Sequence, residues 1–380
     1  MIKRTLVFEP EISGHHLEYL NHIYTGAGEK ANEEFIFIVH PEFRKYKDYL
    51  SWPDFKNVRI DTIGTDQLTG KEGNKYFSAF RRNQLLRKFI SVYNPSHVFL
   101  ITLMHFMPFL PLFLSRRLKV SGIIYNIWLR SYKHDSRLKR VLDTLKYLIL
   151  VNFRIFDRIY ILADPASARL LNRIYKTSRF RYLPDPFMPV TPNNVMDIRQ
   201  KLEIDPGNKI FLHFGSLSER KGTLDILEAL EDIKASELSK ATFIFAGNLN
   251  YDIETVFRKK ADALANKVQI KVYEGFCRYE FLGDLCSVSD YLLLPYRYCS
   301  SSSGLLGFAA QYNVPVIGPD KGLLGALIRA YKLGCVYNVN DPLKLSPVLE
   351  KHINDPSIKI DGRRYLRENN IINFQNKIFE

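Results

Sequence analysis

Residues 211–222 read FLHFGSLSERKG, an apolar run that breaks at a glycine and continues into a polar segment containing Arg220 and Lys221. The apolar run predicts a buried strand over 210–214, and the residues after the segment predict a helix over 223–233. A glycine at such a turn lets the backbone approach a ligand, and a helix N-terminus attracts phosphate. The segment therefore predicts a strand–loop–helix unit that binds an anion. The alternative is a solvated Arg-Lys pair at a helix start.

Outward from this unit, strands and helices alternate along the chain. Further strands are expected at 5–8, 35–39, 58–63, 98–102, 122–127, 158–162, 242–246, 268–272, 291–294, 314–318 and 334–337. Alternation of this kind predicts an α/β protein with mostly parallel, doubly wound sheets. A proline-rich segment near 184–192 divides the strands into two series, and a length of 380 residues suits two hydrophobic cores.

A second motif follows the apolar strand expected at 291–294. Residues 299–310 read CSSSSGLLGFAA. Serine hydroxyls and free amides at a helix N-terminus form a cradle for an anion. The alternative is an ordinary helix cap with additional serines. Open parallel sheets bind ligands beyond the carboxyl ends of their strands, so two facing sheets would place a ligand in the cleft between them.

These motifs, in this order, resemble the C-terminal half of the family 4 glycosyltransferases over about residues 181–340. The resemblance rests on the Gly-x-Leu-x-x-x-Lys-Gly pattern of 215–222 and on further segments at 182–186, 245–247, 273–276, 294–295 and 313–318. Gly14 matches the first glycine-containing loop of the family more loosely. The match is more specific for the fold than for the substrate.

The resemblance implies a GT-B fold: two Rossmann-like doubly wound domains that face a central cleft. Residues 1–186, joined by a C-terminal helix over 360–380, would form the acceptor domain, and 187–359 the donor domain. It also implies a nucleoside-diphosphate sugar as the donor substrate, retention at the anomeric carbon, no cofactor and no obligatory metal. The family's lysine that contacts the donor diphosphate corresponds to Lys221.

Site residues follow from the motifs and the resemblance together. Lys221, Arg220 and His105, which follows the strand at 98–102, are the candidates for catalysis. The donor is expected to meet Gly14, Gly215, Ser216, Lys221, Gly275, Phe276, Ser300, Ser301, Ser302, Ser303, Gly304 and Leu305. Gly275 and Phe276 would contact the base, and Gly304 the diphosphate. His15, His16 and Arg130 are expected on the acceptor side, although a surface pair is the alternative for the two histidines.

The chain departs from the family at several polar positions. Ser216 stands where an arginine is common, and Ser300 and Phe308 stand where the family has two glutamates. The region 127–130 lacks the His-Asp pair that often follows a strand of the first domain. Two functions therefore stay open. One is an active glycosyltransferase, and the other is a catalytically impaired GT-B module that binds nucleotide or glycan or supports a partner transferase.

The positive charge of the chain is concentrated in one stretch. Residues 71–181 hold 22 Lys or Arg and 5 Asp or Glu, a net charge of +17, whereas the other residues hold 32 and 35, a net charge of −3. Within it, residues 81–140 interleave cations with aromatic residues, a mixture typical of proteins that bind anionic membrane surfaces. Nucleic acid is the competing partner, but no binding signature beyond charge accompanies it.

Three further features concern location. The four cysteines show neither paired nor zinc-ligand spacing, which predicts free thiols in a reducing compartment. The apolar run at the N-terminus is shorter than a signal peptide requires. The apolar stretch 98–114 is interrupted by His105, Pro108 and Pro111, so a buried strand and turn are expected rather than a membrane span. We therefore expect a cytoplasmic protein, peripheral at the inner face of the membrane. It would transfer a sugar to a membrane-associated glycan or lipid-linked acceptor in cell-surface polysaccharide synthesis.

Overall fold

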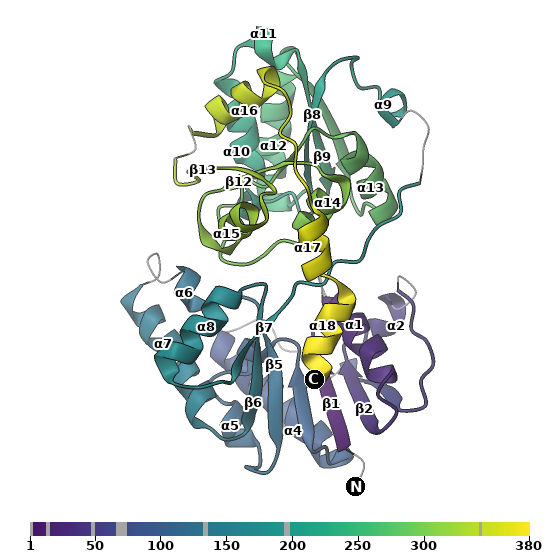
Figure 1. Ribbon diagram of the computed structural model, residues 1–380, viewed down its shortest axis with the longest axis vertical. Helices are drawn as coiled ribbons and strands as arrows, with labels where there is room; N and C mark the ends of the chain where they lie inside the picture. Colours follow the sequence, from purple (N-terminus) through teal and green to yellow (C-terminus); the bar gives the residue numbers. More distant parts are fainter. Residues whose placement is uncertain are drawn as a thin grey trace. The chain divides into compact units, whose positions relative to one another are not determined.

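The computed structural model describes residues 3–12, 16–46, 50–65, 74–131, 136–193, 198–341 and 344–380. The chain forms two compact units (Figure 1). One comprises Met1–Pro186 and Ile371–Glu380, and the other comprises Phe187–Asn370. Each unit contains one parallel sheet covered by helices, so the predicted α/β class with two Rossmann-like domains is confirmed.

The first unit contains a seven-stranded parallel sheet in the order β3-β2-β1-β4-β5-β6-β7. Its strands are β1 (Lys3–Glu9), β2 (Glu33–Val39), β3 (Val58–Thr62), β4 (His97–Leu100), β5 (Lys119–Ile124), β6 (Phe156–Leu162) and β7 (Phe180–Leu183). The central strands are rich in β-branched and aromatic residues and are buried on both faces, as parallel strands between helices must be. Short β7, with only four residues, had no separate sequence signal.

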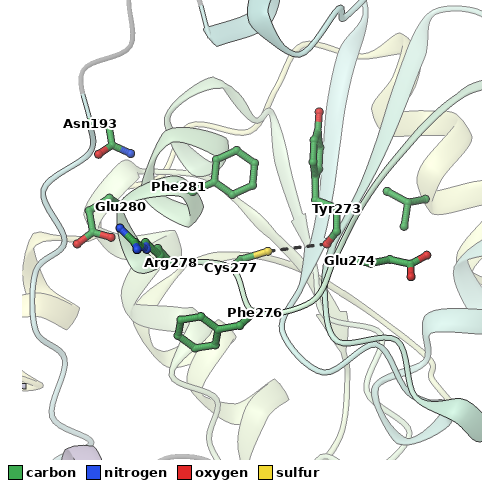
Figure 2. Close-up of a pocket in the computed structure, with 9 residues that line it drawn as sticks. Asn193, Tyr273, Glu274, Phe276, Cys277, Arg278, Glu280 and Phe281 are labelled. Carbon is green, nitrogen blue, oxygen red and sulfur yellow. Dashed lines mark hydrogen bonds between the residues drawn. The ribbon is translucent and has the colours of Figure 1, made fainter. Parts of the chain in front are cut away.

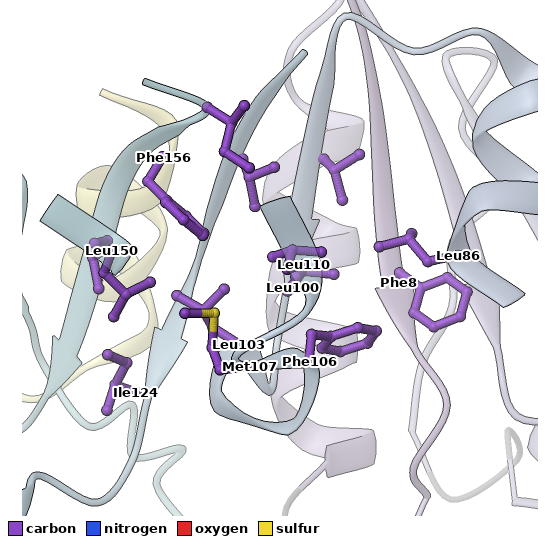
Figure 3. Packing of buried hydrophobic residues seen from close by; sticks show 14 of the residues in the cluster. Phe8, Leu86, Leu100, Leu103, Phe106, Met107, Leu110, Ile124, Leu150 and Phe156 are labelled. Carbon is purple, nitrogen blue, oxygen red and sulfur yellow. The ribbon is translucent and has the colours of Figure 1, made fainter. Parts of the chain in front are cut away.

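Helices cover both faces of this sheet. One hydrophobic core joins the sheet to α4 (Lys75–Tyr93), η2 (Leu103–Phe106), α5 (Leu110–Phe113), α7 (Arg137–Asn152) and α8 (Pro165–Tyr175) (Figure 3). The opposite face is covered by α1 (His16–Gly28) and α18 (Ile371–Phe379), which contact each other. This unit also contains two shorter helices, α2 (Phe43–Tyr46) and α6 (Trp128–Ser131).

The second unit contains a six-stranded parallel sheet in the order β10-β9-β8-β11-β12-β13. Its strands are β8 (Lys209–Phe214), β9 (Ala241–Gly247), β10 (Gln269–Glu274), β11 (Tyr291–Leu293), β12 (Val316–Pro319) and β13 (Gly334–Tyr337). The stacked rings of Phe243, Phe211 and Tyr291 run across β9, β8 and β11 at centroid distances of 4.9 and 5.3 Å. These rings place the core under one face of the sheet.

The helices of the second unit also divide between two faces. The core that contains the stacked rings includes side chains of α10 (Thr223–Glu231), α12 (Tyr251–Leu264) and α16 (Leu345–Asn354). On the other face, α14 (Leu305–Tyr312) packs against β8 through Phe308 and Phe214, beside α13 (Tyr279–Val288). The remaining helices are α9 (Ile198–Lys201), η3 (Glu219–Lys221), α11 (Ala235–Leu238), α15 (Gly322–Tyr331) and α17 (Arg363–Glu368).

Two expectations need correction. We expected one helix over 360–380 that joins the first domain, but the segment forms α17 and α18, and only Ile371–Glu380 belongs to the first unit. α17 stays with the second unit because Tyr365 is buried there against Tyr331. The strand expected at 122–127 is Lys119–Ile124. The stretch 98–114 forms β4, η2 and α5, as expected of a strand and turn. Across the described ranges, no helix combines the length and apolarity needed to cross a membrane.

Candidate functional site

Three glycines end three neighbouring strands of the second sheet. Gly215, Gly247 and Gly275 follow or close β8, β9 and β10 with φ of +104°, +133° and +96°, values that side-chain-bearing residues rarely adopt. A hydrogen bond from the Gly215 amide to the Ala246 carbonyl (2.8 Å) and one from the Gly275 amide to the Gly247 carbonyl (3.2 Å) join them. The carboxyl edge of these strands therefore presents backbone without side chains, which lets a ligand approach closely.

Lys221 lies beside this edge. Its Nζ is 2.9 Å from the position that a Cβ on Gly215 would take, and 5.3 Å from the centre of the Tyr296 ring. Within the described ranges, no carboxylate forms an ion pair with Lys221 or with exposed Arg220, whereas neighbouring Arg297 pairs with Glu219 (2.6 Å) and Asp225. Two cations therefore stand uncompensated at the start of α10, where a phosphate would be bound favourably.

A buried histidine of β8 holds the loop that carries Lys221 through hydrogen bonds. His213 of β8 is buried and hydrogen-bonds the Leu293 carbonyl (2.9 Å) and the Thr223 hydroxyl (3.0 Å). Burial lowers the pKa of His213 to about 4, so the imidazole is neutral at pH 7. The sequence reasoning did not single out His213, although a histidine inside an apolar strand was a visible signal.

The serine run leads into α14, as expected, but its members differ in role. Ser303 is buried, lies 3.2 Å from the Tyr296 hydroxyl, and accepts a long hydrogen bond from the Leu305 amide (3.4 Å). Ser303 is therefore used by the fold, whereas the N-cap residue of α14 is Gly304, which has no side-chain cap bond. Ser300, Ser301, Ser302 and Gly304 are half-buried and remain near the α14 start. Ser216 donates to the Asn250 side chain at the edge of the loop (3.2 Å).

Phe308 fills the place of the second family glutamate with an aromatic side chain. Its ring packs against Phe214 (5.3 Å), Phe187 (5.5 Å) and Tyr279 (6.2 Å), and it is buried. A Cβ on the adjacent Gly307 would lie 2.0 Å from the Phe187 ring, so the contact is close. The position serves packing, and it cannot offer a carboxylate to a ribose.

An open pocket of about 750 Å³ lies at the carboxyl end of β10 (Figure 2). Its walls come from β10, from the turn after it and from the start of α13, and include Tyr273, Phe276 and Arg278. Phe276, which lines this pocket, is 74% exposed. Figure 2 shows the Cys277 sulfur directed at the Tyr273 carbonyl (3.8 Å). The predicted base-contacting segment thus borders a pocket of suitable size.

The acceptor-side candidates His16 and Arg130 lie at the carboxyl end of the first sheet, whereas His15 and the donor-side candidate Gly14 fall outside the described residues. Arg130 donates to both carboxylate oxygens of Asp164 (2.8 and 2.9 Å). Burial opposes ionisation of Asp164, but the bonds from Arg130 and Ser167 prevail and lower its pKa. Arg130 is therefore held in a structural ion pair, which the sequence reasoning missed because Asp164 lies 34 residues away.

His16 and His105 each face a glutamate. His16 Nδ1 lies 3.3 Å from Glu9, and His105 Nδ1 lies 3.8 Å from Glu11, which also pairs with Arg82. Glu9 is fully buried at the end of β1, and burial raises its pKa. Burial also lowers the pKa of His105. His16 and His105 therefore each lie beside a carboxylate at this edge of the sheet. Glu9 is a site candidate that sequence reasoning overlooked.

Metal-binding and disulfide chemistry find no support in the described part of the chain. No group of three or more His, Cys, Asp or Glu is arranged there to hold a metal ion. The four cysteines are free thiols. Burial raises the pKa of Cys286 and raises that of Cys335 to about 11, so neither is a reactive thiolate at pH 7.

A comparison with protein families finds a match over most of the second unit. A family model described as glycosyl transferases group 1 matches residues 194–371. Over these residues, the predicted resemblance to glycosyltransferases is confirmed. The matched segment contains the three edge glycines, Lys221 and the α14 start. A search of curated protein sequences finds no match to this chain.

Solved structures share the fold of the whole chain. WaaG, a glycosyltransferase involved in lipopolysaccharide biosynthesis, is 16% identical with a TM-score of 0.69, over 99% of this chain and 98% of WaaG. Anabaena HepE in complex with UDP-glucose is 14% identical (TM-score 0.70, over 99% and 98%). Sucrose-phosphate synthase of Thermosynechococcus elongatus is 14% identical (TM-score 0.71, over 99% and 97%). This likeness confirms the GT-B fold.

Proposed function

We propose that this protein is a glycosyltransferase that uses a nucleoside-diphosphate sugar as donor. The observation that carries the proposal is Lys221, a cation without a carboxylate partner in the described structure. It is held beside Gly215, on the sheet edge where three neighbouring strands end in glycine, within the matched segment 194–371. Arg220 adds a second cation, and the α14 start adds backbone amides. Together they suit a diphosphate.

The pocket at Phe276 suits the base of the same nucleotide. It lies at the end of β10, two strands from the β8 loop that carries Lys221, along one edge of the sheet. HepE was solved with UDP and with UDP-glucose, so uridine nucleotides are the first to test. Because Phe308 is buried in an aromatic cluster, the ribose would be held without the family's second glutamate.

The chemistry proposed for this site is electrostatic. When the bond between the anomeric carbon and the diphosphate breaks, negative charge develops on the leaving oxygen, and Lys221 and Arg220 would stabilise it. Retention at the anomeric carbon and independence from metal and cofactor belong to the proposal on the ground of family resemblance. His105 and His16, in the first unit, would face the acceptor.

The proposed acceptor is a membrane-associated glycan or lipid-linked oligosaccharide of cell-surface polysaccharide synthesis. WaaG, which shares the fold, is described as acting in lipopolysaccharide biosynthesis. The basic residues of 81–140 would meet an anionic membrane at its cytoplasmic face, with the protein bound peripherally and without nucleic acid as a partner.

A second candidate function is a catalytically impaired GT-B module. The buried aromatic environment of Phe308 and the serine at position 300 favour it, because both family glutamates are replaced. Such a module would bind nucleotide or glycan, or support a partner transferase, without turnover. The two functions differ in one observable, the release of nucleoside diphosphate from the sugar donor.

A thermal-shift panel of UDP, GDP, ADP, CMP and their sugars tests the donor site. A nucleotide present at about 100 times its Kd should stabilise the fold by about 2.7 kcal/mol. We expect one base to give a shift that Lys221→Ala removes and that Lys259→Ala, an exposed lysine on α12, leaves unchanged. No shift with any nucleotide would overturn the donor site. A shift without diphosphate release in the presence of lipid-linked acceptors would favour the impaired module.

A further inference from the structure

The solvent-exposed side of helix α7 carries a row of four aliphatic side chains. Leu138, Val141, Leu145 and Leu148 are spaced three or four residues apart, so they lie on one side of the helix. Their exposed fractions are 70%, 57%, 49% and 40%. We call these four side chains the α7 ridge. A helix that faces water usually places polar residues along this line and keeps such side chains for the core.

The other sides of α7 show that the ridge is not the helix's core face. Tyr147 and Leu150 fill that role and are almost completely buried in the core of the first unit. Asp143 and Lys146 form an ion pair (3.0 Å) whose side chains are only 17% and 14% exposed. The charged pair is thus largely covered while the four aliphatic side chains stand in solvent.

A second apolar group lies on helices that cover the same sheet face. Phe77 and Phe80 of α4 are exposed, and the Phe80 ring packs against Phe113 of α5 (5.2 Å), beside exposed Leu112. Helices α4, α5 and α7 contribute to one core cluster, so their outer surfaces belong to one side of the unit. A second group of exposed apolar side chains, on α4 and α5, therefore lies on the same side of the unit as the ridge.

Exposed cations lie on or next to the elements that carry both patches, and the stretch that contains α4 and α5 has no acidic residue. Residues 74–131 contain nine Lys or Arg and no Asp or Glu. Arg116 and Arg117 are exposed after α5, and Arg137 and Lys139 are exposed in the first turns of α7. The Arg81 guanidinium lies over the exposed Phe77 ring at 4.5 Å. Aliphatic and aromatic side chains beside a cationic field match the two layers of an anionic bilayer surface.

We propose that α7 lies in the interface of an anionic lipid bilayer, with the α7 ridge among the acyl chains and the flanking cations against the headgroups. The α4–α5 patch would form a second contact. Charge complementarity favours lipid over nucleic acid, because nucleic acid would satisfy the cations but leave the ridge in water. The inference rests on the proposed function, which places the basic residues of 81–140 at an anionic membrane, and it adds the apolar surface that would enter the bilayer.

Vesicle flotation of the full chain tests this proposal. We expect binding to vesicles of 70% phosphatidylcholine and 30% phosphatidylglycerol and weaker binding to pure phosphatidylcholine. The double variant Val141→Ser/Leu145→Ser should lower the partition coefficient at least tenfold. The matched control is Val256→Ser, an exposed valine on α12 of the second unit. Because all three side chains are exposed, the variants should melt as the unaltered protein does.

An insertion reporter separates the ridge from simple charge attraction. Leu145→Trp should shift its emission to the blue on the anionic vesicles and be quenched by brominated acyl chains. Arg137→Gln/Lys139→Gln should weaken binding to the anionic vesicles alone. Unchanged binding of the double serine variant, or a tryptophan that stays in water, would overturn the proposal. Light scattering that shows a dimer formed through the ridge would also overturn it. So would an oligonucleotide that displaces the vesicles and binds the double serine variant as tightly as the unaltered protein.

This result can be told apart from a failure of the donor site. The ridge variants should keep the nucleotide-dependent thermal shift, because α7 belongs to the first unit and Lys221 to the second. Loss of vesicle binding with the nucleotide shift intact therefore reports on the ridge alone. A protein that binds vesicles but no nucleotide would overturn the proposed function and leave the membrane surface standing.

Discussion

The imidazole Nε2 of His213 lies 3.0 Å from the hydroxyl of Thr223, beneath the loop that carries Lys221. On the other side of the ring, Nδ1 faces the Leu293 carbonyl, which only accepts, so Nδ1 carries the proton. Nε2 must then accept from Thr223, whose oxygen in turn accepts the Ser218 amide hydrogen (2.9 Å). This chain of three hydrogen bonds ties the loop to β11.

His213→Phe should loosen that loop. The ring volume is kept, but the buried Leu293 carbonyl and the Thr223 hydroxyl hydrogen lose their hydrogen bonds to the imidazole, which costs about 1–3 kcal/mol of unfolding free energy. We also expect weaker nucleotide binding, because the position of Lys221 depends on Ser218 and Thr223. Urea unfolding and nucleotide titration at pH 7.5 check both effects. A variant as stable as the parent would show that the three bonds do not act as a chain.

Stability should fall as the pH is lowered from 6.5 toward 4. Burial lowers the pKa of His22, His97 and His213 to about 4. Below pH 6.5 the unfolded chain binds protons at these positions and the folded chain does not. Proton binding therefore lowers the free energy of the unfolded state relative to that of the folded state. Each histidine should remove about 2 kcal/mol between pH 7.5 and 5.0. Urea midpoints at the two pH values measure the loss, which should be smaller in His213→Phe. A flat profile would contradict the assignment.

Gly247→Ala should be among the most harmful single changes in the second unit. Its φ is +133°, and the new Cβ would lie 1.8 Å from the Gly215 carbonyl oxygen. Backbone strain of this kind costs about 1–3 kcal/mol, and the steric overlap adds to it. Gly207→Ala is the control, since its φ is +82° but no atom lies within 4 Å of its Cβ position. Melting temperatures of the two variants should differ by several degrees, and equal values would refute the close packing of β8 on β9.

Arg297→Met should destabilise the Lys221 loop. Arg297 pairs with the buried Asp225 carboxylate, and its amide donates to the Arg220 carbonyl (3.1 Å). Removing the guanidinium leaves the Asp225 charge buried without its partner, which costs about 3 kcal/mol or more. As a control, Arg363→Met breaks an exposed pair with Asp361 and should change the melting temperature little. A small effect at both positions would count against a structural role for Arg297.

Phe308→Glu should lower the melting temperature and should not strengthen nucleotide binding. The new carboxylate would be placed among Phe187, Phe214 and Tyr279, where burial without a cationic partner is unfavourable. Phe308→Leu, which stays apolar, is the comparison and should be milder. Tighter UDP binding by the glutamate variant would show instead that the family's ribose contact can be restored by one residue.

Much of the fold was predictable because its determinants are local. The apolar runs at 210–214 and 242–246 became β8 and β9 within one residue of the predicted bounds. Glycine followed by a polar segment predicted the turn at Gly215, and only glycine fits its φ. The order of the motifs along the chain, which resembles that of the family, predicted the GT-B fold. None of these inferences required knowledge of which distant segments meet.

The α7 ridge could not be read from the sequence. Apolar residues occupy more than half of the circumference of α7, so periodicity does not show which of them face the core. Packing decided that Tyr147 and Leu150 turn inward, which left Leu138, Val141, Leu145 and Leu148 outside. In the same way, the sequence did not indicate that Arg130 has a partner, whereas in the fold it forms an ion pair with Asp164.

By itself, the sequence determined the alternation of strands and helices, the glycine turns and the charge imbalance, because each depends on the chemistry of neighbouring residues. Tertiary structure alone decided the partners of His213, Phe308 and Arg130 and the outward face of α7. These depend on burial and on hydrogen bonds between segments far apart in the chain, where only the packed fold determines which groups meet and which remain in solvent.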